Sequence, residues 1–253
     1  MAAADQRTAV YDDLAAEQDR LEQVLGGLAA ADWDRPSGAA GWRVRDVVLH
    51  LAQTEELVIA SASGEAGSPF GRRSDDESID DLAGRLVTAE RDTPAGETYQ
   101  RWRTARRGAV GALRRCPPGT RLPWATTTLS PTTLATTRLA EHWAHGLDIT
   151  APLGIPYPDT GRLRHVAWLA TRTLPYAFMA AGQTAAGTVR CSLAAPDGGT
   201  WELGPDDAGS VITGPAGAFC RVAAQRLDPA GSGLTATGPD GAAALRVLRT
   251  YAA

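Results

Sequence analysis

Residues 130–150 read SPTTLATTRLAEHWAHGLDIT, and this is the most informative segment for the fold. Ser130 followed by Pro131 is typical of a helix start, because serine caps the first turn and proline suits the first helical position. Pro152 and Gly154 then end the helical pattern. We therefore expect one long helix that runs to the end of this segment.

The predicted helix carries a stripe of ionisable side chains on one face. Its members lie three or four residues apart and are Arg138, Glu141, His145 and Asp148. The other sides carry enough apolar residues to fill a core, namely Leu139, Ala140, Trp143, Ala144, Leu147 and Ile149. Burial of this helix therefore does not explain the stripe.

Glu141 and His145 form an E-x-x-x-H pair whose side chains can converge on one metal ion. His50 lies in the apolar helical sequence DVVLHL, where a histidine is otherwise unexpected, and it is the candidate for a third ligand. Two imidazoles and a carboxylate suit zinc or a similar divalent ion, and three protein ligands leave one position open. Asp46 and Asp148 are candidates to orient the ligand imidazoles.

The same residues allow other interpretations. A Glu/His pair at this spacing is common on solvated helix faces, and a single histidine within a helix is often a hydrogen-bonded core residue. His142 points about 100° away from Glu141 and is interpreted as a flanking residue, and His165 as a structural one. Arg138 is either a group that binds a substrate carboxylate or an ion-pair partner of Glu141.

Helical spacing of apolar residues predicts further helices on both sides of this segment. They span residues 6–30, a stretch after Trp42 that runs toward Ser61, and residues 79–89, 95–115 and 161–181. Residues 64–76 and the dipeptide Pro117-Pro118 predict loops.

The sequence pattern changes after Gly182. Residues 188–194 alternate as a strand does, and residues 196–199 (PDGG) predict a turn into a return strand over 200–203. The remaining predicted elements are a strand over 210–213, a helix that ends near Arg226, a strand over 234–237 and a helix from Pro239. This order predicts an α+β protein with a helical domain over 1–182 and a small α/β domain over 183–253.

Composition argues against several classes of function. The net charge of −4 gives no sign of a nucleic-acid-binding surface. The sequence contains no apolar run of about 18 residues, so no membrane span is expected. The first residues lack the pattern of a secretory signal. Three widely separated cysteines do not form a disulfide framework, so we expect a cytoplasmic protein.

The segments GWRVRDVVLHL (41–51) and TRLAEHWAHGLDI (137–149) resemble the two metal-ligand helices of the mycothiol-dependent maleylpyruvate isomerase family. That family belongs to the DinB-like four-helix-bundle group. Residues 172–178, 195–205 and 211–226 continue the resemblance in the family's order, so it covers most of the chain. The likeness is to an actinobacterial subgroup described as metal-binding, and it implies an up-down four-helix bundle followed by a small α/β domain.

By this resemblance, His50, Glu141 and His145 match the family's zinc ligands, and Arg226 matches an arginine that serves the isomerase reaction. That reaction uses a low-molecular-weight thiol, mycothiol, which adds to an electron-poor double bond, permits rotation and leaves. None of the three cysteines of this chain suits a nucleophile, so a thiol would come from a cofactor.

Three classes of function remain open. The first is a zinc-dependent isomerase or S-transferase that uses a thiol on a small organic substrate, and we favour it. The second is a thiol-independent metal Lewis acid that acts as a lyase, cyclase or hydrolase. The third is a non-catalytic metal-binding module. The expected partner is a small molecule, with neither a nucleic acid nor a membrane, and the assembly is a monomer or a homodimer.

The side chains that would hold the substrate are less well determined by the sequence. Arg226, with Arg138 second, is the candidate to bind a substrate carboxylate. Trp42, Trp124 and Trp143 are candidates for an apolar wall, although Trp143 fits a core position better. Residues 61–80 and 124–129 depart from the subgroup's pattern, which leaves the substrate open.

Overall fold

The structure is a computed structural model that describes residues 2–64, 77–125, 127–185 and 187–250, with side chains from residue 9 onward. The chain forms two compact units, Met1–Tyr157 and Pro158–Ala252.

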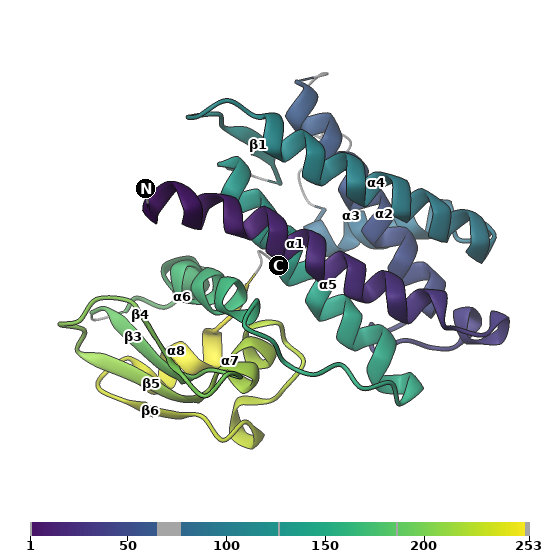
Figure 1. Cartoon of the computed structure of the whole chain (residues 1–253). Helices are drawn as coiled ribbons and strands as arrows, with labels where there is room; N and C mark the ends of the chain where they lie inside the picture. The colour runs from purple at the N-terminus through teal and green to yellow at the C-terminus, as the bar shows by residue number, and fades with distance from the viewer. Residues whose placement is uncertain (1, 65–76, 126, 186, 251–253) are drawn as a thin grey trace. The chain divides into compact units, whose positions relative to one another are not determined.

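Four long helices form the first unit (Figure 1). They are α1 (Ala2–Gly26), α2 (Val44–Ser63), α4 (Ala95–Arg115) and α5 (Pro131–Leu153). The shorter elements of this unit are the 3₁₀ turn η1 (Ala30–Asp34), helix α3 (Ile79–Ala89) and a hairpin of β1 (Leu122–Trp124) and β2 (Thr127–Leu129). Ser130 caps α5 by accepting a hydrogen bond from the Thr133 amide, and Gly154 ends it in the left-handed conformation.

Side-chain pairs fix the directions of the helices. Asp12 pairs with Arg114, and Asp19 with Arg106, so α1 and α4 run in opposite directions. Helix α2 runs parallel to α4. Glu56 pairs with Arg101, and farther along both helices Ile59 lies against Gly108, where an added Cβ would be 2.9 Å from the Ile59 side chain.

Helix α5 runs opposite to α2. His50 faces His145, and Glu55, farther along α2, pairs with Arg138, which is earlier on α5. The four long helices therefore run up, down, down and up in chain order. The bundle is confirmed, but its second and third long helices do not alternate in direction. The segment between them, which includes α3, makes the crossover that parallel neighbours require.

An apolar cluster fills the bundle beside η1. Its buried members come from α1, η1, α2, α4 and α5 and are Leu21, Leu25, Trp33, Val44, Val47, Val48, Leu51, Ala52, Trp102 and Ile149. Because Val44, Val47, Val48 and Leu51 of α2 are fully buried in this cluster, the start of α2 is held firmly where it leads to His50.

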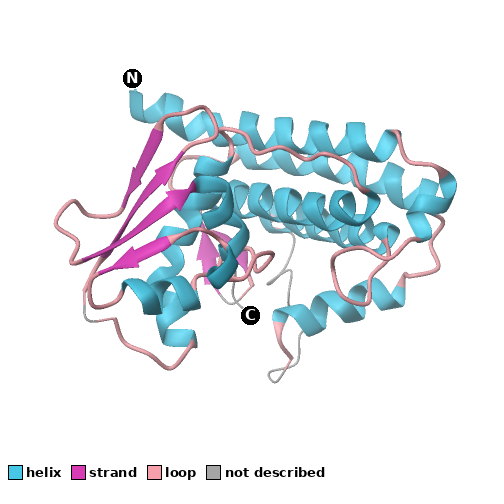
Figure 2. Cartoon of the chain, turned by 90° about the horizontal axis from the view of Figure 1, so that it is seen from below, coloured by secondary structure: helices cyan, strands magenta, loops and turns pink. Residues whose placement is uncertain are grey.

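The second unit is a four-stranded sheet with three helices (Figure 2). The strands are β3 (Val189–Ala194), β4 (Thr200–Leu203), β5 (Ser210–Pro215) and β6 (Thr235–Thr237), in the order β4-β3-β5-β6. The β3–β5 pair is parallel and the other two pairs are antiparallel. Helices α6 (Leu163–Ala180), α7 (Ala216–Ala223) and α8 (Gly241–Val247) pack on the sheet, and a 3₁₀ turn, η2 (Pro229–Gly231), precedes β6.

The α+β class and the expected helices and strands are confirmed. The boundary between the compact units lies at residue 157, whereas the sequence placed it at 182. The difference is α6, which packs against β3, β4, α7 and α8 of the second unit. Helical periodicity shows that α6 has an apolar face but not which layer covers it, so the sequence assigned it to the bundle. The sequence also gave no strand for the β1–β2 hairpin. Most of the expected loop over 64–76 lies outside the described residues.

Candidate metal centre

His50 of α2 meets Glu141 and His145 of α5 inside the bundle. One ligand atom from each of the three residues lies within 4.8 Å of the others. The Glu141 carboxylate oxygen Oε2 is 3.6 Å from Nε2 of His50 and 3.4 Å from Nε2 of His145. The two imidazole rings have centroids 5.0 Å apart in an edge-to-face arrangement. The structure thus brings together the three residues that the sequence selected.

These distances suit a shared cation. Two atoms that each lie about 2.1 Å from one ion at a tetrahedral angle are about 3.4 Å apart. The measured separations between Glu141 Oε2 and the two imidazole nitrogens are close to that value. Two nitrogens and one carboxylate oxygen are also a donor set that zinc accepts. The residues present therefore fit a divalent ion with one coordination position left open.

Solvent can reach the three ligand side chains. His50 and His145 are each 11% exposed at the side chain, and Glu141 is 28% exposed. A closed structural zinc site is fully ligated by the protein, whereas this set has three ligands and partial exposure. The arrangement therefore resembles the open sites at which a small molecule can approach the ion.

The protonation states of the three ligands are coupled. Burial lowers the pKa of His50, which favours the neutral imidazole that binds metals. Burial acts to raise the pKa of Glu141, but hydrogen bonds with His145 and His50 outweigh it and hold the pKa well below its usual value. Burial acts to lower the pKa of His145, but bonds with Asp148 and Glu141 raise it. A cation at this point therefore competes with protonation of His145.

Asp148 orients His145 as the sequence predicted. His145 Nδ1 lies 2.9 Å from Asp148 Oδ2, and this contact directs the other ring nitrogen, Nε2, toward Glu141. The loop before α2 supports Asp148, because the Gly38 amide donates to its backbone carbonyl at 2.7 Å. A Cβ at Gly38 would lie 3.1 Å from Asp148, which explains why glycine suits this position.

Trp42 lies beside both imidazoles. Its ring centroid is 5.1 Å from that of His50 and 6.3 Å from that of His145. It therefore forms an aromatic wall at the candidate metal centre. Trp143, in contrast, is 1% exposed and belongs to the core.

Asp46 does not orient His50, contrary to the sequence expectation. Its carboxylate accepts hydrogen bonds from Arg43 and Arg91 and caps the first turn of α2. Arg91 also donates to the Gly41 carbonyl, so these contacts hold the loop that carries Trp42. An aspartate one turn before a histidine is equally able to cap its own helix, and here the cap prevails.

Arg138 contacts α2 instead of forming the suggested ion pair with Glu141. Its Nε donates to Glu55 Oε1 at 2.9 Å, and its Nη2 donates to Thr54 Oγ1 at 2.7 Å. The sequence did not single out Glu55 or Thr54. Thr54 lies about one helical turn after His50, but without the partner helix neither residue indicates a site.

His142 is a core histidine. It is fully buried, its Nδ1 faces the Arg138 carbonyl at 2.8 Å, and Trp102 Nε1 donates to its Nε2 at 3.2 Å. Burial and then the charge of Arg138 hold the pKa of His142 well below its usual value. It is neutral and both ring nitrogens are engaged. His165 lies on α6, which belongs to the second unit.

The remaining candidates from the sequence are Arg226, Trp124 and the cysteines. Arg226 belongs to the second unit, follows the end of α7, is half-buried, and donates through Nη1 to the Ala224 carbonyl. The Trp124 ring, in β1, lies 5.9 Å from the Arg138 guanidinium carbon. Burial raises the pKa of the Cys191 thiol to about 11 and raises that of Cys220 further.

No helix among the described residues is both long and apolar enough to cross a membrane.

Comparisons with known proteins agree with the fold. The family described as "Mycothiol maleylpyruvate isomerase N-terminal domain" matches residues 14–150, a segment that includes all three candidate ligands. Two Mycobacterium tuberculosis proteins are each 34% identical over 251 residues, which cover 95% of this chain and 94% of theirs. They are "Uncharacterized protein MT0041" of strain CDC 1551 / Oshkosh and "Uncharacterized protein Rv0036c" of strain ATCC 25618 / H37Rv.

Two solved structures share this fold. The crystal structure of the mycothiol-dependent maleylpyruvate isomerase matches with a TM-score of 0.63 and 15% identity, over 93% of this chain and 95% of that chain. A histidine-to-alanine mutant of that isomerase matches with a TM-score of 0.61 and 14% identity, over the same shares. At this identity the likeness establishes the α+β architecture alone.

Proposed function

This chain belongs to the mycothiol maleylpyruvate isomerase N-terminal domain family, and from that premise we propose that it is a zinc-dependent enzyme that uses a small thiol. Its substrate is a small organic molecule and its reaction is an isomerisation or an S-transfer. The observation that carries the proposal is the convergence of His50, Glu141 and His145 within 4.8 Å, with Glu141 partly open to solvent.

The three ligands would hold the ion, and each has a separate role. His50 supplies a neutral imidazole from α2, and His145 supplies a second from α5, oriented by Asp148. Glu141 supplies the negative charge that partly balances a divalent cation. A zinc ion held by these residues would lower the pKa of a bound thiol and so supply a thiolate nucleophile near neutral pH.

The thiol comes from outside the chain. Cys191 and Cys220 are buried, and burial raises the pKa of both thiols, so neither forms a thiolate near neutral pH. Burial also raises the pKa of Cys116. A soluble thiol such as mycothiol, after which the family is named, fills that role.

Trp42 and Arg226 are the proposed substrate-contacting residues. Trp42 excludes water from one side of the two imidazoles and offers an apolar face to the substrate. Arg226 can bind a carboxylate through two parallel hydrogen bonds, which is the role that the sequence resemblance implies. Arg138 is the weaker candidate for that role, because Glu55 and Thr54 already engage its guanidinium.

Metal analysis of the purified protein tests the proposal. We expect about one zinc ion per chain in the wild type and loss of that ion in His50→Ala and Glu141→Ala, because each removes one of three ligands. His165→Ala is the matched control and should keep the ion, because His165 is not one of the three residues that converge. Full occupancy in His50→Ala would contradict the proposed ligand set.

The thiol requirement needs a separate measurement. We expect binding of mycothiol to the zinc-loaded wild type and weaker binding to the metal-free protein. Turnover of maleylpyruvate that depends on added thiol would identify the isomerase reaction. Zinc binding without any thiol binding would instead support the thiol-independent Lewis-acid class.

A further inference from the structure

A buried ion pair joins α2 to α5 about one helical turn from the ligands. Arg138 is 2% exposed and Glu55 is fully buried, and Arg138 Nε donates to Glu55 Oε1 at 2.9 Å. The second carboxylate oxygen of Glu55 is also buried and has no hydrogen-bond partner among the described residues. A carboxylate and a guanidinium have thus been removed from water with incomplete hydrogen bonding.

Such a pair is not explained by stability. Transfer of two charges into a protein interior costs several kcal/mol per ion, and replacing a buried pair with apolar side chains of similar volume is often neutral or stabilising. Its best-attested benefit is to fix the register between packed elements. The register of α2 against α5 is what places His50 opposite Glu141 and His145.

The hydrogen bonds of Arg138 lead to a ligand. Its Nη2 donates to Thr54 Oγ1 at 2.7 Å, and the Thr54 hydroxyl donates to the His50 backbone carbonyl at 2.8 Å. On α5, Arg138 lies three residues before Glu141, on the same helix face. Arg138 therefore connects the helix turn that carries one ligand to the helix turn that carries another.

We propose that Arg138, held by Glu55 and acting through Thr54, is a positioning residue that sets the register of α2 and α5 at the metal centre. This inference rests on the proposed function. In this role the Glu55–Arg138 pair is required for tight metal binding and not for folding. Arg138 then acts on the metal ligands and does not contact the substrate.

Two variants test the positioning role. Glu55→Leu/Arg138→Met removes both charges together, and we expect a urea midpoint equal to or above that of the wild type. We expect its dissociation constant for Zn²⁺, measured by competition with a chelator, to rise about 10- to 100-fold, as for other groups that orient ligands. Thr54→Val keeps the ion pair and the volume but breaks the link to His50, and should weaken Zn²⁺ binding by a smaller factor. Absorption of bound Co²⁺ should change in both variants.

Arg106→Met is the matched control. Arg106 is also a buried arginine in a helix–helix ion pair, 4% exposed and bonded to Asp19 and Glu22 of α1, but it is not linked to a ligand. We expect a lower urea midpoint with an unchanged affinity for Zn²⁺.

The outcomes separate this inference from the proposed function. Wild-type affinity for Zn²⁺ in both the double variant and Thr54→Val would overturn the positioning role while the metal site stands. A wild-type protein that binds no Zn²⁺ would overturn both. If the double variant does not fold, the pair is required for folding and Thr54→Val alone decides the role of the link.

Discussion

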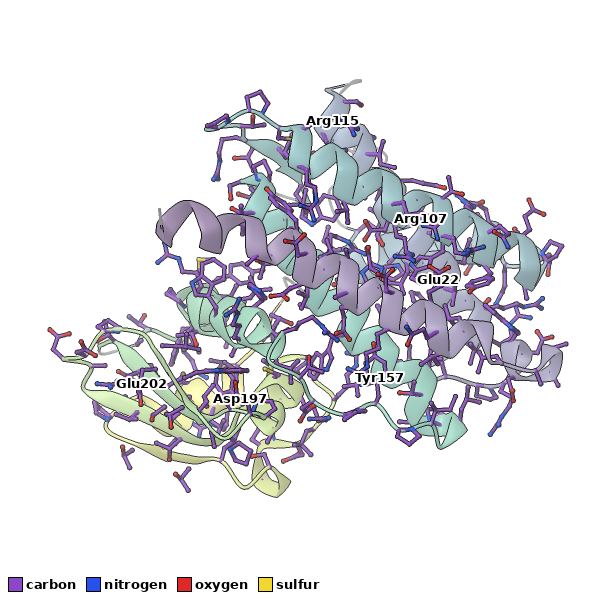
Figure 3. The ribbon with its side chains drawn as sticks, viewed as in Figure 1. Glu22, Arg107, Arg115, Tyr157, Asp197 and Glu202 are labelled. Atoms are coloured by element: carbon purple, nitrogen blue, oxygen red, sulfur yellow. The ribbon has the colours of Figure 1, made fainter. Side chains whose placement is uncertain are left out.

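Two helix–helix contacts in the same bundle carry charged side chains, but they use them in opposite ways. Between α1 and α4 arginines pair with acids, and the pairs among the described side chains are Arg103–Glu22, Arg106–Asp19, Arg106–Glu22, Arg107–Glu22 and Arg114–Asp12. Glu22 and Arg107 are labelled on this side of the bundle in Figure 3. Between α2 and α5, two imidazole nitrogens and a carboxylate oxygen face one another.

The difference separates a contact between paired charges from a candidate binding site. Across α1 and α4 the opposite charges face and largely offset one another. Lone pairs that converge between α2 and α5 are satisfied together only by a proton or a cation. A set of acceptors that meet at one point, partly open to solvent, is therefore a better indicator of a binding site than the number of charges at a helix contact.

His142 and His145 of α5 repeat the contrast within a single turn. His142 has both ring nitrogens engaged by groups of the bundle core. His145 has one nitrogen on Asp148 and the other facing Glu141 and His50. Both are buried, so burial does not separate a core histidine from a candidate ligand, whereas the direction of the second nitrogen does.

The gain in unfolding free energy on zinc binding should be the largest change. It is also the most direct test of the difference between the two helix contacts. Zinc at about 1,000 times its dissociation constant should raise the free energy of unfolding of the metal-free protein by about 4 kcal/mol, because only the folded chain assembles the three ligands. Urea unfolding with zinc and with a chelator measures the change. Glu141→Gln should show little or none of it. An equal gain in Glu141→Gln would mean that zinc binds elsewhere.

His142→Ala should destabilise the fold without affecting the metal. The substitution leaves a cavity and an unpartnered Trp102 Nε1, and we expect a loss of about 3 kcal/mol in the free energy of unfolding. Urea unfolding in the presence of a chelator measures this loss, and metal analysis of the folded protein should still give the wild-type zinc content. Loss of zinc with little change in stability would reverse the roles assigned to His142 and His145.

The sequence selected the three candidate ligands because their spacing is local or their chemistry is rare. Glu141 and His145 are one turn apart on one helix, and a chain with four histidines offers few choices for a third ligand. His50 also stands in an apolar run that does not need it. The packing of α2 against α5 was then sufficient to bring all three together.

The rest depends on tertiary contacts that no single helix encodes. Glu55 and Thr54 acquire their meaning only from Arg138 on the partner helix. Asp46 was expected to orient an imidazole, but its carboxylate accepts from Arg43 and from Arg91, which comes from another part of the chain. The place of α6 depended on which layer covers its apolar face. The sequence thus predicts the helices and strands and the apolar or polar character of their faces. Which faces meet depends on tertiary packing.

Asp148→Asn sharpens the contrast between the two histidines of α5. An amide keeps the shape of Asp148 but is a weaker acceptor for the His145 Nδ1 proton, so zinc affinity should fall by about tenfold, or about 1.4 kcal/mol. Chelator competition measures the affinity. Asp19→Asn, which changes a carboxylate that is 62% exposed on α1, is the control and should bind zinc as the wild type does. Equal affinities in all three proteins would remove Asp148 from the site.

The α1–α4 contact should give the smallest effect. Arg114 and Asp12 are 40% and 71% exposed at their side chains, so water and salt screen their attraction. Arg114→Ala should therefore change the free energy of unfolding by no more than about 0.5 kcal/mol, and about 0.5 M salt should reduce the difference further. Urea unfolding at low and high salt measures it, with zinc affinity as an independent readout. A loss above about 1 kcal/mol, or a change in zinc affinity, would mean that the α1–α4 pairs help to hold the metal helices in place. The two contacts would then act as one cooperative unit.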